Sequence, residues 1–188
     1  DHVHLPDRPR RLRRTEALRR LARETRLHPS ELIAPLFVTA GKPGERTPIG
    51  ALQGHFRLGV KAAAEEAQRL EALGVGGVIL FGIPATKSAD GREGFDPKGP
   101  VCEGLKAIGA AAPRLVRMAD VCLCEYTSHG HCGVLERGGA SVDNDATLAV
   151  YAEMAVAQAE SGAHLLGPSG MMDGQVAAIR QALDRAGH

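Results

Sequence analysis

The sequence predicts an α/β fold in which strands alternate with helices. Four short apolar runs recur along the 188 residues, and a helical pattern follows each of them. Because parallel strands need long crossover connections, this alternation favours βα units and a parallel sheet. The runs are nearly all apolar, which is typical of strands covered on both faces. With 44% hydrophobic residues, the length supports one domain with a substantial core.

The four predicted strands are runs of Val, Ile, Leu and Phe. They cover residues 32–38, 75–81, 115–121 and 163–167. The first run contains Pro35, which has no N–H to donate to a neighbouring strand. We therefore expect that strand to be locally irregular or to lie at an edge of the sheet.

The predicted helices follow the strands and end at recognisable stop signals. They cover residues 58–73, 100–112, 145–162 and 172–186. Asn144 precedes the third helix as a capping residue, and Gly162 ends it. Gly74 and Gly187 end the first and the last helix in the same way.

The loops that follow the strands are the expected place for chemistry. In βα proteins, functional residues gather at the C-terminal ends of the strands. Residues 42–57 and 86–97, which are rich in Gly, Pro and charge, are predicted to be loops there. A cysteine-rich segment, residues 120–133, begins where the third strand ends, and residues 169–174 follow the fourth. We expect these two segments to lie on the same side of the sheet and to form one site.

Three of the four cysteines lie in residues 120–133. If the backbone is extended, Cys122 and Cys124 point to the same side because one residue separates them. Cys132 returns after a glycine-containing loop that is long enough to fold back on the first two. Three thiolates suit Zn2+, which binds cysteine sulfur at about 2.3 Å in tetrahedral geometry. Because only three ligands are supplied, a fourth position is left for water or substrate, which indicates a catalytic zinc site.

A single disulfide with one spare thiol is the alternative interpretation of this cluster. Cysteines that lie so close in sequence rarely bridge, and the first residues show no apolar signal segment. We therefore expect the reducing cytoplasm, where clustered cysteines favour metal binding. No apolar run approaches the roughly 18 residues of a membrane span, so no membrane partner is expected. Cys102, outside the cluster, is expected to be a buried small apolar residue.

The charge of the chain is unevenly distributed. Residues 1–26 contain nine arginines and four acidic residues, which gives +5, so a net charge of +1 leaves −4 for the remainder. A basic arm favours nucleic-acid binding as one interpretation. However, no aromatic residue lies among these arginines and no recognition motif follows. We therefore expect an arm that is solvated or contacts another subunit, and no nucleic-acid partner.

The chain resembles a known family. Residues 120–133 match throughout the motif D-x-C-x-C-E-Y-T-S-H-G-H-C-G of the zinc-dependent porphobilinogen synthases, also called δ-aminolevulinic acid dehydratases. The cysteine motif alone is highly specific. Further matching segments follow in order along almost the whole chain, at residues 8–14, 32–38, 78–82, 142–147 and 167–174.

The resemblance implies a TIM (β/α)8 barrel preceded by an N-terminal arm. Because such a barrel takes about 250 residues, about the first four βα units are expected here. Residues 1–28 would be the basic arm and residues 29–188 a partial barrel. The resemblance also implies a hydro-lyase of haem and porphyrin biosynthesis that condenses two 5-aminolevulinate molecules into porphobilinogen with loss of two waters. Family members are homo-oligomers, commonly octamers.

The resemblance also implies roles for individual residues. Cys122, Cys124 and Cys132 match the ligands of the active-site zinc, and Asp120 matches an acidic catalytic residue. Ser169, in the Pro-Ser of the last matching segment, is the expected substrate-binding residue.

Four further positions, in or directly beside these segments, bear on the site. His131 lies beside the last zinc ligand and is expected to support it as a second-shell partner. A purely structural role in the loop is equally open for His131 and for His129. The chain departs from the family at two positions, where Gly170 replaces a usually acidic residue and Gln175 a usually basic one.

The two lysines that form Schiff bases in the family lie beyond the last residue of this chain. The five lysines present lie in polar loops or on helices, where surface charges are expected: Lys42, Lys61, Lys87, Lys98 and Lys106. We therefore expect a zinc-bearing part of the enzyme that is inactive alone. The alternative is a non-catalytic zinc-binding module or a decayed relative. The ligands of any allosteric Mg2+ site would lie in the missing part.

Overall fold

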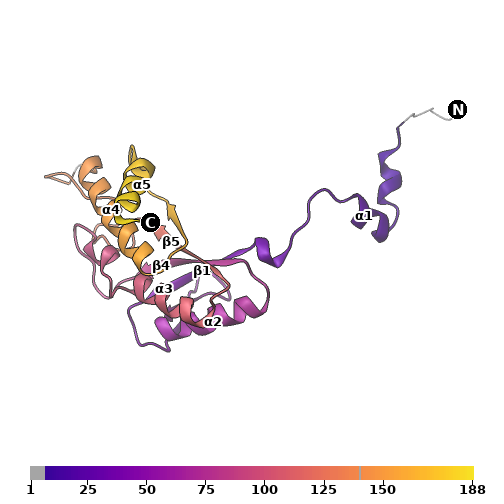
Figure 1. The fold of residues 1–188 in the computed structure, drawn as a ribbon, viewed down its shortest axis with the longest axis horizontal. Helices are drawn as coiled ribbons and strands as arrows, with labels where there is room; N and C mark the ends of the chain where they lie inside the picture. The colour runs from indigo at the N-terminus through magenta and orange to yellow at the C-terminus, as the bar shows by residue number, and fades with distance from the viewer. Residues whose placement is uncertain (1–6, 140) are drawn as a thin grey trace.

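The computed structural model describes residues 7–139 and 141–188, so residues 1–6 of the predicted arm lie outside the described part. A slender arm leads into a body in which helices pack on a sheet (Figure 1). The arm contains η1 (Pro9–Arg13), α1 (Glu16–Ala22) and η2 (Pro29–Glu31). The body contains, in chain order, β1 (Ile33–Thr39), β2 (Arg46–Pro48), β3 (Phe56–Gly59), α2 (Val60–Ala72), β4 (Gly77–Ile83), η3 (Arg92–Phe95), α3 (Pro100–Ala111), β5 (Val116–Val121), α4 (Asn144–Glu160), β6 (Leu165–Pro168) and α5 (Gln175–Ala186).

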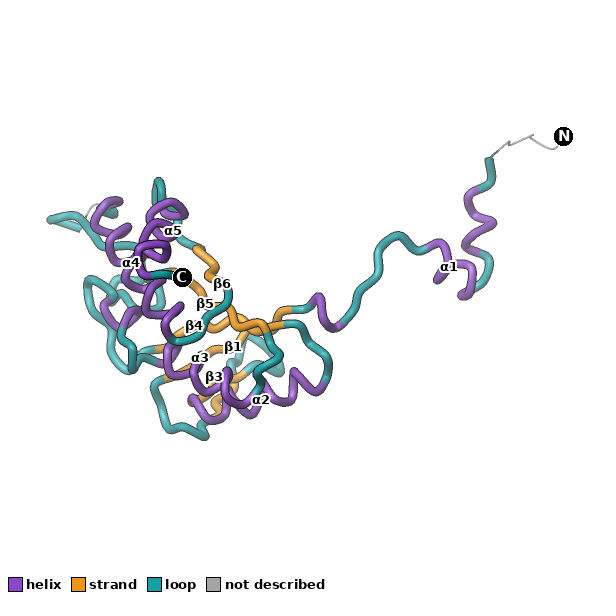
Figure 2. The backbone as a smooth tube through the Cα atoms, viewed as in Figure 1, coloured by secondary structure: helices purple, strands orange, loops and turns teal. Residues whose placement is uncertain are grey.

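The sheet has six strands in the order β2-β3-β1-β4-β5-β6. Neighbouring strands are parallel except for the antiparallel pair of β2 and β3. The strands β1, β4, β5 and β6 follow chain order across the sheet, as the tube in Figure 2 shows. Because βαβ crossovers are right-handed, the connecting helices α2, α3 and α4 then lie on one face. The predicted α/β fold with parallel βα units is confirmed.

The predicted elements correspond closely to the observed ones. The four predicted strands are β1, β4, β5 and β6, each of which starts one or two residues later than predicted. The late start of β4 has a local cause, because the Val75 N–H bonds back to the Leu70 carbonyl and so completes the end of α2. The four predicted helices are α2, α3, α4 and α5. The predicted cap of α4 is wrong by one residue, because Asp143 and not Asn144 accepts from the Ala146 N–H. Across the described residues, none of the helices has the length and apolar character that a membrane crossing requires.

The prediction of simple loops between the main elements is wrong in part. Residues 42–57 contain β2 and the start of β3, which form a hairpin. β3 then pairs with the free side of β1 at residues 37–39. These two strands have three and four residues, too few to show a periodicity in the sequence. Residues 86–97 likewise contain the short helix η3.

The prediction that the strand with Pro35 is irregular or lies at an edge is wrong for β1 as a whole, but Pro35 itself has no neighbouring strand on one side. β1 lies inside the sheet, between β3 and β4, and is not an edge strand. However, β3 pairs only with residues 37–39 of β1. On the other side, the Leu32 carbonyl and the Ala40 N–H bond to β4, which shows that even-numbered residues direct their backbone groups toward β4. Pro35 therefore faces the unpaired side of β1, where its missing N–H costs no ladder hydrogen bond.

The core consists of two clusters on the helix-covered side of the sheet. One cluster packs β1 and β4 against α2 and α3 and includes Val38, Leu80 and Leu105. The other surrounds the end of β5, α4 and α5 and includes Tyr126 and Tyr151. The second cluster therefore supports the segment that carries three of the cysteines.

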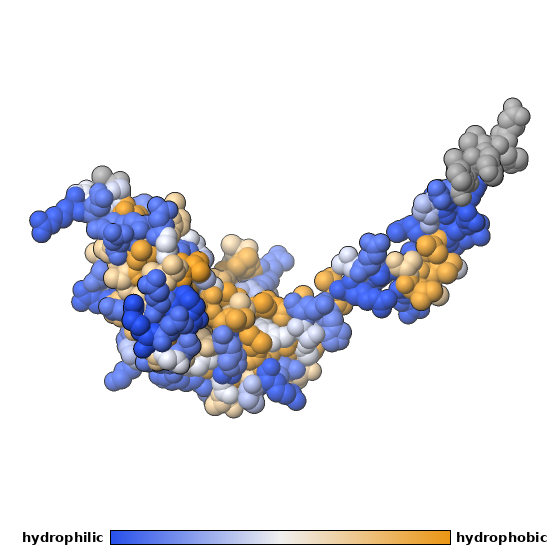
Figure 3. Space-filling view, turned by 45° about the horizontal axis from the view of Figure 1, so that its top comes forward, coloured by the Kyte–Doolittle hydropathy of each residue, from blue (hydrophilic) through white to orange (hydrophobic). Residues whose placement is uncertain are grey.

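The opposite face of the sheet is not covered by any helix of the described residues. Along β1 and β4, buried side chains alternate with half-buried or exposed ones. Ile33 is 50% exposed and Leu165 of β6 is 51% exposed. Apolar surface extends from the base of the arm into the body (Figure 3). The strands are apolar on both faces, as predicted, but the described chain covers only one of them.

The described part of the arm stands away from the body (Figure 1). The residues of η1 and α1 are all exposed or half-buried. Among the exposed residues are Leu12, Leu21 and Leu27, which are apolar. The arm therefore carries apolar side chains that the described body does not cover. The expected contact of the arm with another subunit stays a prediction.

Candidate metal centre

The cysteine segment leaves the sheet at the C-terminal end of β5. Asp120 and Val121, the last residues of this strand, pair with Gly167 and Pro168 of β6. The segments that follow the two strands therefore start side by side at one edge of the sheet. The prediction that both lie on the same side is confirmed.

The three cysteines of the segment converge. The Sγ atoms of Cys122 and Cys124 lie 3.4 Å apart, and those of Cys122, Cys124 and Cys132 all lie within 4.8 Å of one another. All four cysteines of the chain carry free thiols. Sulfur atoms that bind one Zn2+ tetrahedrally at about 2.3 Å lie about 3.8 Å from one another. The group is therefore arranged so that it could hold one such ion.

Two buried hydroxyl groups hold the returning part of the segment. The Thr127 hydroxyl donates to the His131 carbonyl at 2.7 Å, which closes the loop on itself. The Tyr151 hydroxyl, on α4, donates to the Cys132 carbonyl at 2.5 Å. The position of the third cysteine therefore depends on a helix that follows it in the chain.

The loop between β4 and α3 supports the segment from another side. The Ser88 N–H donates to the Tyr126 carbonyl at 3.2 Å, and the Ser88 carbonyl accepts from the Ser128 N–H at 2.8 Å. The Tyr126 ring passes over β4 at Gly82, where a Cβ would overlap the tyrosine hydroxyl. The cysteine segment is thus fixed by contacts to two other loops or helices.

The two histidines of the segment differ in their contacts. His129 Nδ1 accepts from the His131 N–H at 3.2 Å, and His129 Nε2 lies 3.0 Å from the Ala89 carbonyl, to which it donates. These two bonds favour the structural alternative for His129. The His131 side chain is exposed and does not belong to the three-cysteine group. Its support of the adjacent cysteine stays a prediction.

When no cation is bound, the surroundings of the cysteines favour the neutral thiol over the charged thiolate. Burial raises the pKa of the Cys124 thiol, and the neighbouring Cys122 raises it further. The same causes raise the pKa of Cys132. A divalent cation reverses this effect, because it stabilises the thiolates that bind it. Three cysteine sulfurs are soft ligands, so the donor set fits Zn2+ and not Mg2+.

Two carboxyl groups lie next to the cysteines. Asp120 is 6% exposed, and burial raises its pKa, while a hydrogen bond from Ser169 lowers it. Burial raises the pKa of Glu125 to about 8; the charge of Asp120 adds to this and Lys87 opposes it. Glu125 is therefore mostly protonated near neutral pH and able to donate a proton. Sequence reasoning did not predict a role for Glu125. Its position inside the cysteine motif is the one feature of the sequence that could have indicated such a role.

The loop after β6 brings the other predicted residue to the same place. Ser169 is exposed and lies close enough to Asp120 to act on its pKa. Gln175 closes this loop: its Oε1 accepts from the Met172 N–H and its Nε2 donates to the Gly170 carbonyl, both at 3.1 Å. The structure therefore gives Gln175, one of the two departures, a local structural role.

The predictions for the remaining cysteine and the lysines are confirmed. Cys102 is buried in the core between α3 and α4, where its Sγ lies 3.7 Å from the Ala157 carbonyl. All five lysines are exposed. Lys106 forms a surface ion pair with Glu103 at 2.9 Å. Lys87 is exposed like the other lysines, but it also lies close enough to Glu125 to lower the pKa of that carboxyl.

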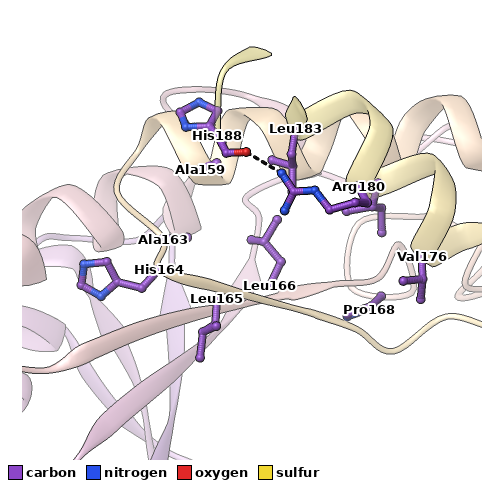
Figure 4. Close-up of a pocket in the computed structure, with 11 residues that line it drawn as sticks. Ala159, Ala163, His164, Leu165, Leu166, Pro168, Val176, Arg180, Leu183 and His188 are labelled. Atoms are coloured by element: carbon purple, nitrogen blue, oxygen red, sulfur yellow. Dashed lines mark hydrogen bonds between the residues drawn. The ribbon is translucent and has the colours of Figure 1, made fainter. Parts of the chain in front are cut away.

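A cavity of about 500 Å3 lies away from the cysteines, on the outer side of β6 (Figure 4). Its walls come from β6, α4 and α5 and are largely apolar, with Leu165, Leu166 and Leu183 among them. Arg180 crosses its upper side and donates to the His188 carbonyl. In the part of the chain that the structure describes, no strand follows β6 in the sheet. The cavity therefore marks an unpaired edge, and it is not part of the metal centre.

The fold and the site define an α/β protein with a candidate metal centre at the C-terminal ends of its parallel strands. Residues 6–188 match the family "Delta-aminolevulinic acid dehydratase". The chain is 52% identical over 186 residues to the protein of that name from Streptomyces coelicolor and 53% identical over 190 residues to that from Mycobacterium tuberculosis; each match covers 96% of this chain and 55% of the relative. The chain therefore belongs to the delta-aminolevulinic acid dehydratase family.

A solved structure is similar along nearly the same length. It is that of delta-aminolevulinic acid dehydratase (porphobilinogen synthase) from Toxoplasma gondii in complex with the reaction product porphobilinogen. The TM-score is 0.91 at 34% identity, over 97% of this chain and 52% of that chain. The chain thus spans about half the length of the relatives that it matches.

Proposed function

We propose that this chain is the zinc-bearing part of a porphobilinogen synthase, which condenses two 5-aminolevulinate molecules into porphobilinogen with loss of two waters. The observation that carries the proposal is the convergence of Cys122, Cys124 and Cys132 within 4.8 Å. They converge at the end of a parallel strand in a chain of this family. The reaction would serve haem and porphyrin biosynthesis in the cytoplasm.

The body is proposed to be the first part of a (β/α)8 barrel. Its strands β1, β4, β5 and β6 follow chain order across the sheet, which is how a barrel grows. The face opposite the helices and the edge at β6 are both uncovered among the described residues. In a closed barrel, side chains fill that interior and no edge remains. These features support a barrel that the second part of the family's sequence would close.

The site residues divide the work between metal binding and proton transfer. The three cysteines hold the zinc, which when bound acts as a Lewis acid or lowers the pKa of a bound water. Glu125, whose carboxyl is partly buried next to Cys124 and has a pKa of about 8 in the metal-free chain, serves as the proton donor. Asp120, buried beside it, serves as the acceptor or orients the substrate. Ser169 binds the substrate next to Asp120, and His131 supports the loop of Cys132.

The amines that activate the substrates are proposed to come from the rest of the barrel. A nucleophilic lysine needs a desolvated position or a neighbouring cation, and all five lysines here are exposed. We therefore expect this chain alone to form no porphobilinogen. The missing part would also hold any allosteric Mg2+ site. The arm is proposed to join copies into a homo-oligomer, an octamer in the full-length enzyme, through its exposed leucines.

Complementation tests this proposal. The chain is loaded with Zn2+ under reducing conditions and supplied with 5-aminolevulinate. It is tested alone and together with the C-terminal part of the Streptomyces coelicolor relative that lies beyond the matched region. Porphobilinogen is expected only in the mixture, and not when Cys124→Ala replaces the parent chain. Product from the chain alone would contradict the missing-lysine argument. A zinc-loaded chain that no C-terminal part activates would favour a non-catalytic zinc-binding module.

A further inference from the structure

Tyr151 is a buried residue at the metal centre that the proposed function does not use. It lies on α4, its side chain is fully buried, and its hydroxyl donates to the Cys132 carbonyl at 2.5 Å. Cys122 follows β5 directly and Cys124 lies in the turn that comes next, whereas Cys132 arrives through a long loop. The Tyr151 hydroxyl therefore acts on the cysteine that is farthest along the chain from the strand.

Gly170, in the loop after β6, lies so close to the same tyrosine that no side chain fits there. A Cβ at Gly170 would overlap the Tyr151 hydroxyl and lie 2.8 Å from two carbons of its ring. The backbone at Gly170 is not in the left-handed region, so the lack of space alone excludes a larger residue. The Gly170 carbonyl is itself held by Gln175 at 3.1 Å. A larger residue at position 170 would therefore displace the Tyr151 hydroxyl, so that substitutions at these two positions affect each other.

We propose that Tyr151 and Gly170 form one positioning unit that sets where Cys132 lies relative to the other two cysteines. The tyrosine holds the Cys132 carbonyl, and the glycine leaves the space that the hydroxyl needs. The proposal rests on the proposed function only in that the cysteines bind zinc, because neither residue takes part in the reaction. Removal of a group that orients a metal ligand by hydrogen bonding typically lowers metal affinity by about 10–100-fold.

Two variants test the unit through zinc affinity. Tyr151→Phe keeps the ring and removes the donor, so the Cys132 loop loses its anchor. Gly170→Ala keeps the donor and displaces it, because the new methyl group takes the place of the hydroxyl. Each is expected to weaken zinc binding by roughly 10–100-fold in competition with a chelator. In a Tyr151→Leu background, Gly170→Ala should cause no further loss, because the ring and the hydroxyl are gone.

Matched controls separate this effect from general destabilisation. Tyr126→Phe removes the only other tyrosine hydroxyl of the chain, which lies over Gly82 and not at Cys132. Gly167→Ala adds a methyl group to β6, where the nearest atom would lie at 3.7 Å, an ordinary contact. Both control variants should bind zinc as the parent chain does. Far-UV circular dichroism of each variant establishes that it is folded.

A spectroscopic signal gives a second readout that does not depend on affinity. The chain has two tyrosines and no tryptophan, so its near-UV absorbance comes mainly from Tyr126 and Tyr151. Zinc binding should perturb the tyrosine absorbance of the parent chain and of Tyr126→Phe, but not of Tyr151→Phe. In chains loaded with Co2+, Tyr151→Phe and Gly170→Ala should both shift the visible cobalt bands.

The outcomes separate the two proposals. If the parent chain binds zinc and both variants bind it equally well, with unchanged spectra, the positioning unit is refuted while the zinc site stands. If the folded parent chain binds no zinc, the site and the positioning unit are refuted together. Weaker binding in Tyr151→Phe and Gly170→Ala, with both controls unchanged, supports the unit.

Discussion

The cysteine segment and the free edge of β6 lie on neighbouring strands but differ in how far this chain completes them. The cysteine segment is held by the loop between β4 and α3 and by α4; Thr127 of the segment and Tyr151 of α4 are fully buried. The β6 edge has no further strand in the described part of the chain, leaves Leu165 51% exposed and borders an apolar cavity. The candidate metal centre is therefore a local structure of this chain, whereas in the proposed barrel the sheet would be closed by residues outside it.

This difference implies that metal binding and catalysis can be separated. The proposed zinc ligands come from one segment of fewer than fifteen residues, and the helix that holds its returning part, through Tyr151, also belongs to this chain. By the proposed function, the amines that activate the substrates and the second half of the barrel would come from outside this chain.

The largest effect is expected from removing a ligand. Cys124→Ala leaves two sulfurs, so zinc affinity should fall on the order of several hundredfold, because each ligand supplies a large share of the binding free energy. Chelator competition measures the loss. Cys102→Ala is the matched control, because that thiol is buried between α3 and α4, and it should leave the zinc content unchanged. Equal zinc loss in both variants would mean that the site depends on folding in general and not on its ligands.

A smaller effect is expected from the buried carboxyl at the site. The Glu125 pKa is about 8 in the folded chain against 4.5 as its ordinary value, so the folded state retains a proton that the unfolded state releases. Its stabilising effect is therefore full below pH 4.5 and is lost as the pH rises to about 8. Glu125→Gln should match the parent at pH 4.5 and exceed its free energy of unfolding at pH 9 by about 1–3 kcal/mol, since partial exposure weakens the effect.

Urea unfolding of the metal-free chains at both pH values tests this difference. Glu136→Gln, at an exposed position of the following loop, is the matched control and should show no such dependence on pH. If Glu125→Gln and Glu136→Gln respond alike, the Glu125 carboxyl is not buried as described.

The smallest effect is expected at the open face of the sheet. The apolar side chains that no described helix covers should make the isolated chain self-associate. Leu165→Glu places a charge on that face and should weaken association several-fold in sedimentation velocity. Leu73→Glu, at a position 58% exposed at the end of α2, serves as the control and should change little. A parent chain that remains a dispersed monomer would contradict the partial barrel and favour a self-sufficient α/β domain.

The sequence predicted those features that depend on residues close to one another in the chain. The apolar runs gave β1, β4, β5 and β6, because a buried strand needs only a short local pattern. The convergence of the three cysteines was likewise predicted from one short segment. However, β5 ends at Val121 and residues 123–126 form a turn, so Cys124 is not placed by the extended backbone that the prediction assumed. The hairpin of β2 and β3 was missed because its strands are too short and too polar for any periodicity.

The features that depend on distant contacts could not be predicted. Glu125 has a raised pKa mainly because the fold buries it, and nothing in the local sequence shows this burial. The fit of Gly170 to Tyr151 joins two residues that lie on different elements. The uncovered face was predicted only from the number of strands. The composition of each single strand instead indicates a strand that is covered on both faces.

The most direct test of the central claim measures metal and covalent chemistry on one preparation. The chain is purified under reducing conditions, its zinc content is determined, and it is then treated with 5-aminolevulinate and borohydride. The account predicts about one zinc per chain and an unchanged mass, because the cysteines converge within 4.8 Å while all five lysines are exposed. A chain that holds no zinc, or one that gains a reduced substrate adduct on a lysine and forms porphobilinogen unaided, would contradict it.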